Sequence, residues 1–122
     1  SGVITRFIDR LKQGKPPVIY GDGEQTRDFV HVNDTVEANM LALNCQRSAG
    51  EVINVGTGKP TTINQLAMVL IGLSGSNNLK PIHSAPRKGD IKSSCADISK
   101  AKRVLGYEPT VILKEGLKSL LK

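Results

Sequence analysis

The sequence predicts an α/β fold, in which helices surround a small mixed sheet. Three observations support this prediction. Apolar residues recur at helical spacing in several separate stretches, and short β-branched runs lie between them. Glycines and prolines interrupt the chain at the boundaries of these stretches. The predicted strands are too few and too short for a complete doubly wound sheet, so the 122 residues form one domain or a part of a larger one.

The amino-terminal part predicts one helix and two strands around a tight turn. Apolar residues over 3–11 have the spacing of an amphipathic helix, and the prolines at 16–17 end it. The run Val-Ile-Tyr at 18–20 predicts a short buried strand. Gly-Asp-Gly at 21–23 predicts a close turn, because glycine accepts backbone angles that other residues avoid. Residues 29–32 then predict a second strand.

The middle of the chain predicts two further helices with a strand between them. Asp34 and Glu37 have the spacing of a capping box, so the second helix is expected to begin at Asp34. Residues 52–55 form a compact apolar run that predicts a strand. Thr62 and Gln65 form another capping box, which predicts the start of the third helix.

The carboxy-terminal part predicts one more strand, a loop and two helices. A short strand is expected over 80–84, followed by a polar, glycine-containing loop over 85–92. Asp97 is expected to cap a helix that Gly106 closes, and leucines at helical spacing over 113–121 predict the last helix. Strands and helices therefore alternate along the chain, as in α/β proteins.

Composition and charge exclude several classes of protein. The net charge of +6 favours anionic partners. The lysines are scattered along the predicted helices, however, and few aromatic residues accompany them, so we predict no nucleic-acid partner. No apolar run has membrane-spanning length, and we predict no membrane partner. Cys45 and Cys95 lie far apart without a CxxC motif, which predicts a reduced, cytoplasmic protein.

Several candidate motifs have simpler structural interpretations. Gly56-Thr57-Gly58 resembles the opening of a dinucleotide fingerprint, but the third glycine and the later acidic residue are missing, so we predict a tight turn and no cofactor-binding residue. Asp22, Glu24 and Asp28 do not match a calcium loop and are interpreted as turn and surface residues. His31 is interpreted as structural. The histidines and cysteines lack ligand spacing, so we predict no metal site and no catalytic residue.

Arg27 and Arg87 are the strongest candidates for ligand binding. Arg27 follows the glycine turn, and Arg87 lies in a loop that Pro86 and Gly89 shape. Two guanidinium groups from separate loops can hold a diphosphate through forked, charge-assisted hydrogen bonds. Asp90 could accept hydrogen bonds from a sugar hydroxyl. By composition alone, two ordinary surface arginines explain the pattern equally well.

A longer pattern extends through essentially the whole chain. Its segments, in order, are VIYGDGEQTRDFVHVND at 18–34, VINVGTG at 52–58, PRKGDI at 86–91, ADISKA at 96–101, LGYEP at 105–109 and LKEGL at 113–117. This pattern resembles the nucleotide-sugar epimerases and dehydratases of the extended short-chain dehydrogenase/reductase family. Within that family it is most similar to the UDP-glucose 4-epimerases.

The resemblance implies a substrate-binding role for nine residues. The segment 18–20 matches the wall of the uracil pocket, with its aromatic ring against the base. Arg27 and Arg87 match the arginines that hold the diphosphate, and Asp90 matches the residue that binds the ribose hydroxyls. A small residue at the place of Ser94, beside the hexose, implies room for an N-acetyl group. The nine residues are Val18, Ile19, Tyr20, Arg27, Arg87, Lys88, Gly89, Asp90 and Ser94.

Two family features do not occur in this sequence, namely the glycine-rich NAD fingerprint and the Tyr-x-x-x-Lys catalytic pair. The resemblance therefore implies that residues 1–122 are the carboxy-terminal, nucleotide-sugar binding domain of a longer chain and lack most of the Rossmann domain. Ser1 stands almost directly at a predicted helix, which agrees with this expectation. The implied full-length enzyme is an NAD-dependent UDP-sugar 4-epimerase and a homodimer. This portion alone is expected to be inactive.

Two alternatives stay open at this point. The same portion of a dTDP-glucose 4,6-dehydratase or of a UDP-glucuronate decarboxylase would carry the same motifs, because the acids and bases that distinguish these enzymes lie mostly outside it. The second alternative is a stand-alone nucleotide-binding module, either for nucleotide-sugars or, given the positive charge, for nucleic acid.

Overall fold

The computed structural model describes residues 2–121, so Ser1 and the expectation attached to it lie outside the described residues. In chain order the elements are α1 (Val3–Lys12), β1 (Val18–Tyr20), β2 (Thr26–Arg27), α2 (Val32–Leu43), the 3-10 turn η1 (Gln46–Ser48), β3 (Thr61–Thr62), α3 (Ile63–Ser74), β4 (Ile82–Ser84), α4 (Ser99–Leu105) and α5 (Leu113–Leu120). The predicted α/β class is confirmed.

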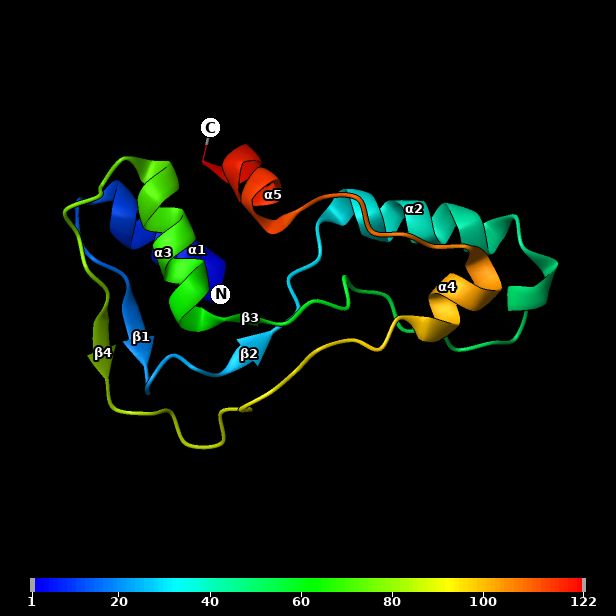
Figure 1. Cartoon of the computed structure of the whole chain (residues 1–122), viewed down its shortest axis with the longest axis horizontal. Coiled ribbons are helices and arrows are strands. Elements are labelled where there is room, and N and C mark those ends of the chain that lie inside the picture. The colour runs from blue at the N-terminus through cyan, green and yellow to red at the C-terminus, as the bar shows by residue number, and fades with distance from the viewer. Residues whose placement is uncertain (1, 122) are drawn as a thin grey trace.

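The described chain is elongated, with packed elements at both ends (Figure 1). One end holds α1, α3 and α5 together with β1 and β4, and the other holds α2, η1 and α4. Two short sheets are formed: β1 pairs with β4 in parallel, and β2 pairs with β3 in antiparallel orientation. Parallel and antiparallel pairing therefore both occur, as predicted for a small mixed sheet, but the two kinds of pairing lie in separate two-stranded sheets.

Each end has its own hydrophobic core. At the first end, Phe7 and Leu11 of α1 pack with Ile19 of β1 and with Leu66 and Leu70 of α3. Burial of such side chains stabilises a protein by roughly 1.5–3 kcal/mol each. This core holds β1 firmly against the helices, so the residues that β1 presents have fixed positions.

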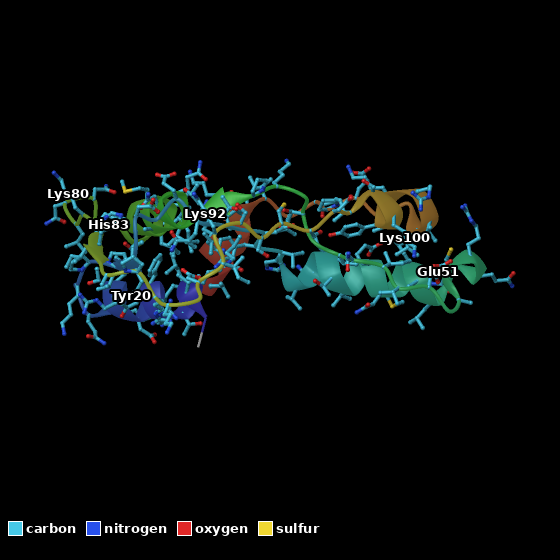
Figure 2. The ribbon with its side chains drawn as sticks, turned by 90° about the horizontal axis from the view of Figure 1, so that it is seen from below. Tyr20, Glu51, Lys80, His83, Lys92 and Lys100 are labelled. Atoms are coloured by element: carbon cyan, nitrogen blue, oxygen red, sulfur yellow. The ribbon has the colours of Figure 1, made fainter. Side chains whose placement is uncertain are left out.

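The second core lies between α2 and α4 and is centred on Tyr107, which is fully buried. The Tyr107 hydroxyl donates a hydrogen bond of 2.7 Å to the carbonyl oxygen of Gly56. At this end Lys100 also pairs with Glu51 at 2.7 Å, far from Tyr20 at the opposite end of the molecule (Figure 2).

Asp34 has a different role from the one predicted. The second helix begins at Val32, because the His31 side chain accepts from the backbone N–H of Asn33 and caps it. Asp34 is buried in the first turn, where its carboxylate accepts from the backbone N–H groups of Thr110 and Val111. The prediction of a capping box at Asp34 is therefore wrong, whereas the structural interpretation of His31 is confirmed.

Two predicted strands are wrong. Residues 29–31 are irregular because they lead directly into the cap of α2, and the nearby strand β2 covers only Thr26–Arg27. Residues 51–55 form no strand because, within residues 2–121, no other segment pairs with them. Strand propensity alone does not make a strand, since the backbone groups need a partner.

The helix caps agree more closely with prediction. The capping box of Thr62 and Gln65 at the start of α3 is confirmed. Gly106 closes α4 as predicted. The predicted cap at Asp97 is wrong by one residue, because the N-cap of α4 is Ile98, which makes no side-chain cap bond. The Asp97 carboxylate accepts from the Ser99 backbone N–H at 3.0 Å just outside the helix. None of the helices within residues 2–121 has the length and apolar character needed to cross a membrane.

Candidate functional site

The principal cavity has a volume of about 770 Å³ and lies between α1, β1 and the chain segments around residues 25–29, 54–56 and 87–96. Lys88 and Gly89 are exposed and do not line it, although they belong to the same loop as residues that do. Seven of the nine predicted binding residues line it, namely Val18, Ile19, Tyr20, Arg27, Arg87, Asp90 and Ser94.

Strand pairing brings β1 beside the loop that carries Arg87. Tyr20 is in register with Ser84 at the end of β4, and the next backbone N–H, that of Gly21, donates to the Ser84 carbonyl at 2.9 Å. The loop that follows β4 therefore begins next to Tyr20. The guanidinium carbon of Arg87 lies 4.2 Å from the centre of the Tyr20 ring, in a cation–π arrangement.

The turn between β1 and β2 is held against the start of α3. The Asn64 backbone N–H donates to the Gly23 carbonyl at 3.0 Å, and the Asn64 side-chain amide donates to the Asp22 carbonyl at 2.9 Å. Gly23 has φ +77°, and a Cβ there would overlap the Asn64 side chain, so only glycine fits. This close turn, which the sequence predicted, directs the chain into β2 and places Arg27 in the cavity wall.

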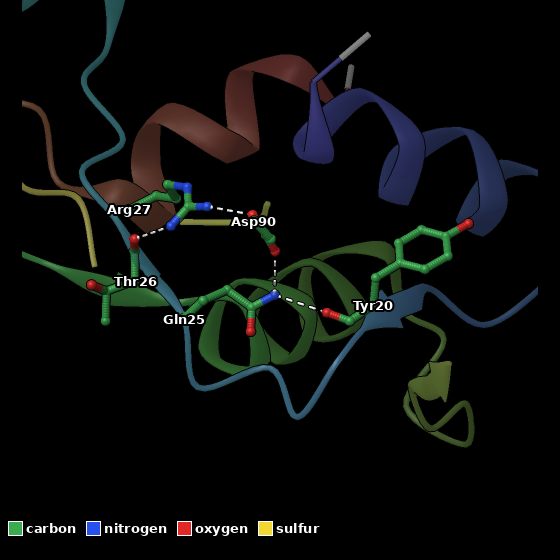
Figure 3. Close-up of polar contacts among 5 residues, drawn as sticks. All are labelled: Tyr20, Gln25, Thr26, Arg27 and Asp90. Carbon is green, nitrogen blue, oxygen red and sulfur yellow. Dashed lines mark hydrogen bonds and ion pairs between the residues drawn. The ribbon is translucent and has the colours of Figure 1, made fainter. Parts of the chain in front are cut away.

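Arg27 is held from two sides. The backbone of Thr26 receives a hydrogen bond from Ser94 N–H at 3.1 Å and donates one to the Lys92 carbonyl at 2.9 Å, so residues 92–94 run along β2. The Arg27 Nη2 atom lies 2.8 Å from Asp90 Oδ1, and Nη1 donates to the Thr26 carbonyl at 2.6 Å (Figure 3). The two side chains remain partly exposed, at 26% for Arg27 and 34% for Asp90.

Sequence reasoning missed Gln25. Its side-chain Nε2 donates to the Tyr20 carbonyl at 3.0 Å and to Asp90 Oδ2 at 3.3 Å (Figure 3). The only local signal was its position in the long motif at 18–34, two residues before Arg27. The contact with Asp90 spans 65 positions in the sequence, so no local pattern could reveal it.

Sequence reasoning also assigned Asp28 to the surface, whereas its carboxylate is part of the fold. It accepts from the backbone N–H groups of Thr57, Gly58 and Ala96 at 3.0, 2.9 and 3.3 Å. Burial alone would raise the pKa of Asp28, but hydrogen bonds from the Thr57 hydroxyl and from these backbone groups hold the pKa below its ordinary value.

The Gly56-Thr57-Gly58 turn therefore binds an anion that belongs to the chain itself. A Cβ at Gly56 would lie 2.6 Å from Asp28 Oδ2 and 2.7 Å from the Ala96 Cβ. The predicted requirement for a small residue in this turn is confirmed. Because the Asp28 carboxylate takes these N–H groups, they are not available to the phosphates of a dinucleotide.

The remaining candidates for catalysis or metal binding have structural surroundings. His83 Nε2 lies 2.9 Å from Asn64 Oδ1, and both cysteines are free thiols. Burial and, secondarily, the nearby Asp28 carboxylate raise the pKa of the Cys95 thiol, which makes it a weaker nucleophile. Within residues 2–121, no three histidine, cysteine or acidic side chains gather as metal ligands.

Comparison with known proteins agrees with this fold. The chain is 38% identical, over 96% of its length, to the UDP-glucose 4-epimerase of Mycolicibacterium smegmatis. A UDP-glucose 4-epimerase of Thermotoga maritima, solved with UDP-glucose, superposes with a TM-score of 0.87 over 97% of the chain at 45% identity. The UDP-glucuronic acid 4-epimerase of Bacillus cereus, solved with UDP-glucuronic acid and NAD, gives a TM-score of 0.87 over 97% at 35% identity.

The fold is that of part of an extended short-chain dehydrogenase/reductase. The family model described as GDP-mannose 4,6 dehydratase matches residues 1–120, and the chain belongs to this family of nucleotide-sugar dehydratases and epimerases. It spans 37–38% of the length of the three relatives above, so it corresponds to less than two fifths of each.

Proposed function

We propose that this chain is the nucleotide-sugar binding portion of a UDP-glucose 4-epimerase. The observation that carries the proposal is the cavity, which Arg27 and Arg87 line from separate segments and in which the Asp90 carboxylate pairs with Arg27. Two cations and one carboxylate match the chemistry of a nucleoside diphosphate, whose phosphates accept forked hydrogen bonds and whose ribose donates them.

Each segment of the cavity has a part in this binding. The β1 segment, residues 18–20, provides an apolar wall and an aromatic ring for the uracil. Arg27 and Arg87 hold the diphosphate, and Asp90 accepts from the ribose hydroxyls. Lys88 and Gly89 lie on the same loop as Arg87 and Asp90, at the exposed edge of the site and outside the cavity wall.

The sugar lies toward Ser94, and the epimerisation takes place on the sugar. Ser94 and Cys95 line the cavity with small side chains, which supports the proposal that an N-acetyl group fits here. Residues outside this chain would hold NAD, which would supply reversible hydride transfer at C4 of the sugar. The side chains of this portion contribute by binding the nucleotide, so that the sugar stays attached to the site while it rotates to present its other face.

The partner that completes the enzyme is an amino-terminal Rossmann domain of the same protein, in a cytoplasmic homodimer. The support for this partner is a row of apolar side chains at helical spacing on α2. Val32, Val36, Met40 and Leu43 are 65%, 52%, 50% and 80% exposed. Such a row is typical of a surface that another element covers.

The same site would also serve a dTDP-glucose 4,6-dehydratase or a UDP-glucuronate decarboxylase, and the family model is described as a dehydratase. Product analysis on the full-length protein distinguishes these enzymes. UDP-galactose formed from UDP-glucose supports the epimerase. A 4-keto-6-deoxy sugar formed from dTDP-glucose, or carbon dioxide released from UDP-glucuronate, would show one of the other two activities. Failure to bind UDP in calorimetry would refute the whole proposal.

A further inference from the structure

Gln25 joins the two halves of the candidate site. Its side-chain amide has two hydrogens, and the contacts at 3.0 Å to the Tyr20 carbonyl and 3.3 Å to Asp90 Oδ2 use one hydrogen each (Figure 3). One end of this bridge is the strand that faces the base. The other end is the carboxylate assigned to the ribose, on a different segment of the chain.

The backbone of Gln25 is anchored, whereas Asp90 lies on an exposed loop. The Ile63 N–H at the start of α3 donates to the Gln25 carbonyl at 3.1 Å, and α3 belongs to the first hydrophobic core. The amide of Gln25 therefore reaches from the packed part of the molecule to the loop. Asp90 takes its orientation from a group that the core holds in place.

The ion pair with Arg27 does not orient Asp90 alone. It uses only Oδ1, and both side chains remain in contact with water, which weakens such a pair. A bond from Gln25 at the other oxygen fixes the plane of the carboxylate. Each carboxylate oxygen has two lone pairs, so each can accept one bond from the protein and one from a ligand hydroxyl.

We propose that Gln25 is a positioning residue for nucleotide binding. It fixes the Asp90 carboxylate relative to the base-facing strand, so that the ribose and the base are recognised together. This inference rests on the proposed function, in which Asp90 binds the ribose hydroxyls.

The test measures ribose discrimination in the full-length protein. Calorimetry gives the Kd values of UDP and of 2′-deoxy-UDP for the wild type and for Gln25→Met, which keeps the side-chain volume but removes both hydrogen bonds. We expect the wild type to prefer UDP by about tenfold, equivalent to about 1.4 kcal/mol. In Gln25→Met we expect a preference below about threefold, with 2′-deoxy-UDP bound about as well as before.

Two further variants separate positioning from stability. Gln25→Asn keeps the amide but is one methylene shorter, so it cannot reach both the Tyr20 carbonyl and Asp90. We expect the same loss of preference for UDP. This variant also provides the test if Gln25→Met does not fold. Gln65→Met is the matched control, because Gln65 belongs to the capping box of α3 and not to the cavity wall. It should lower stability and leave the UDP preference unchanged.

The outcomes distinguish this inference from the proposed function. A wild type that does not bind UDP, or that binds both nucleotides equally, overturns the proposed site and this inference with it. A wild-type preference that both Gln25 variants retain overturns the inference alone. Equal weakening of both nucleotides in these variants also overturns it, because that pattern indicates a purely structural residue.

Discussion

Replacement of each arginine by alanine tests the diphosphate site most directly. Arg27 and Arg87 line one cavity, and a hydrogen bond from a charged donor is worth about 1.5–3 kcal/mol. Arg27 is 26% exposed and Arg87 belongs to the exposed residues, so solvent screening places both near the lower end of this range. We therefore expect Arg27→Ala and Arg87→Ala in the full-length protein each to raise the Kd of UDP by about tenfold.

The comparison with uridine makes the assay specific. Uridine has the base and the ribose but no phosphate, so calorimetry should show its binding reduced less than about threefold in either variant. Arg47→Ala is the control, because Arg47 is an exposed residue of η1, outside the cavity wall. The assignment of the arginines to the diphosphate fails if UDP binds equally well to wild type and both variants. It also fails if uridine and UDP lose affinity to the same extent.

Three further predictions concern stability, sugar choice and the isolated chain. Asp28→Asn should reduce the free energy of unfolding by roughly 1–2 kcal/mol in urea denaturation at pH 7, because an amide cannot accept from all the N–H groups around it; an unchanged midpoint would contradict the role of Asp28. The pKa of Asp28 in the folded protein is lowered from its ordinary value of 3.8. The ionised carboxylate therefore contributes fully to stability above pH 3.8, and this contribution is lost as the pH falls through the lower folded pKa. In acid, the stabilities of wild type and Asp28→Asn should converge. Ser94→Tyr should abolish turnover of UDP-N-acetylglucosamine and largely spare UDP-glucose in a coupled assay, and equal loss on both would show that Ser94 is not in the sugar wall. Residues 1–122 alone should neither bind NAD tightly nor convert UDP-glucose, and activity of the purified chain would refute this.

The sequence by itself determined where helices occur and selected seven side chains that line the cavity as candidates for binding. The capping box of Thr62 and Gln65 and the closing glycine at 106 act within one or two helical turns, so the local sequence contains the information. Arg27 and Arg87 were selected as candidates because their residue type suits a diphosphate and their motifs are specific. The structure then placed both in one cavity, together with Asp90.

Only the tertiary structure decided which polar groups meet and which apparent strands form. The contacts of Asp28 with Thr57, of Gln25 with Asp90 and of Asp34 with Thr110 join residues 29, 65 and 76 positions apart. Carboxylates and amides accept many partners, so their type does not indicate which one the fold supplies. Residues 52–55 have strand propensity but no paired strand among residues 2–121, because a strand is completed by hydrogen bonds that its own sequence cannot provide.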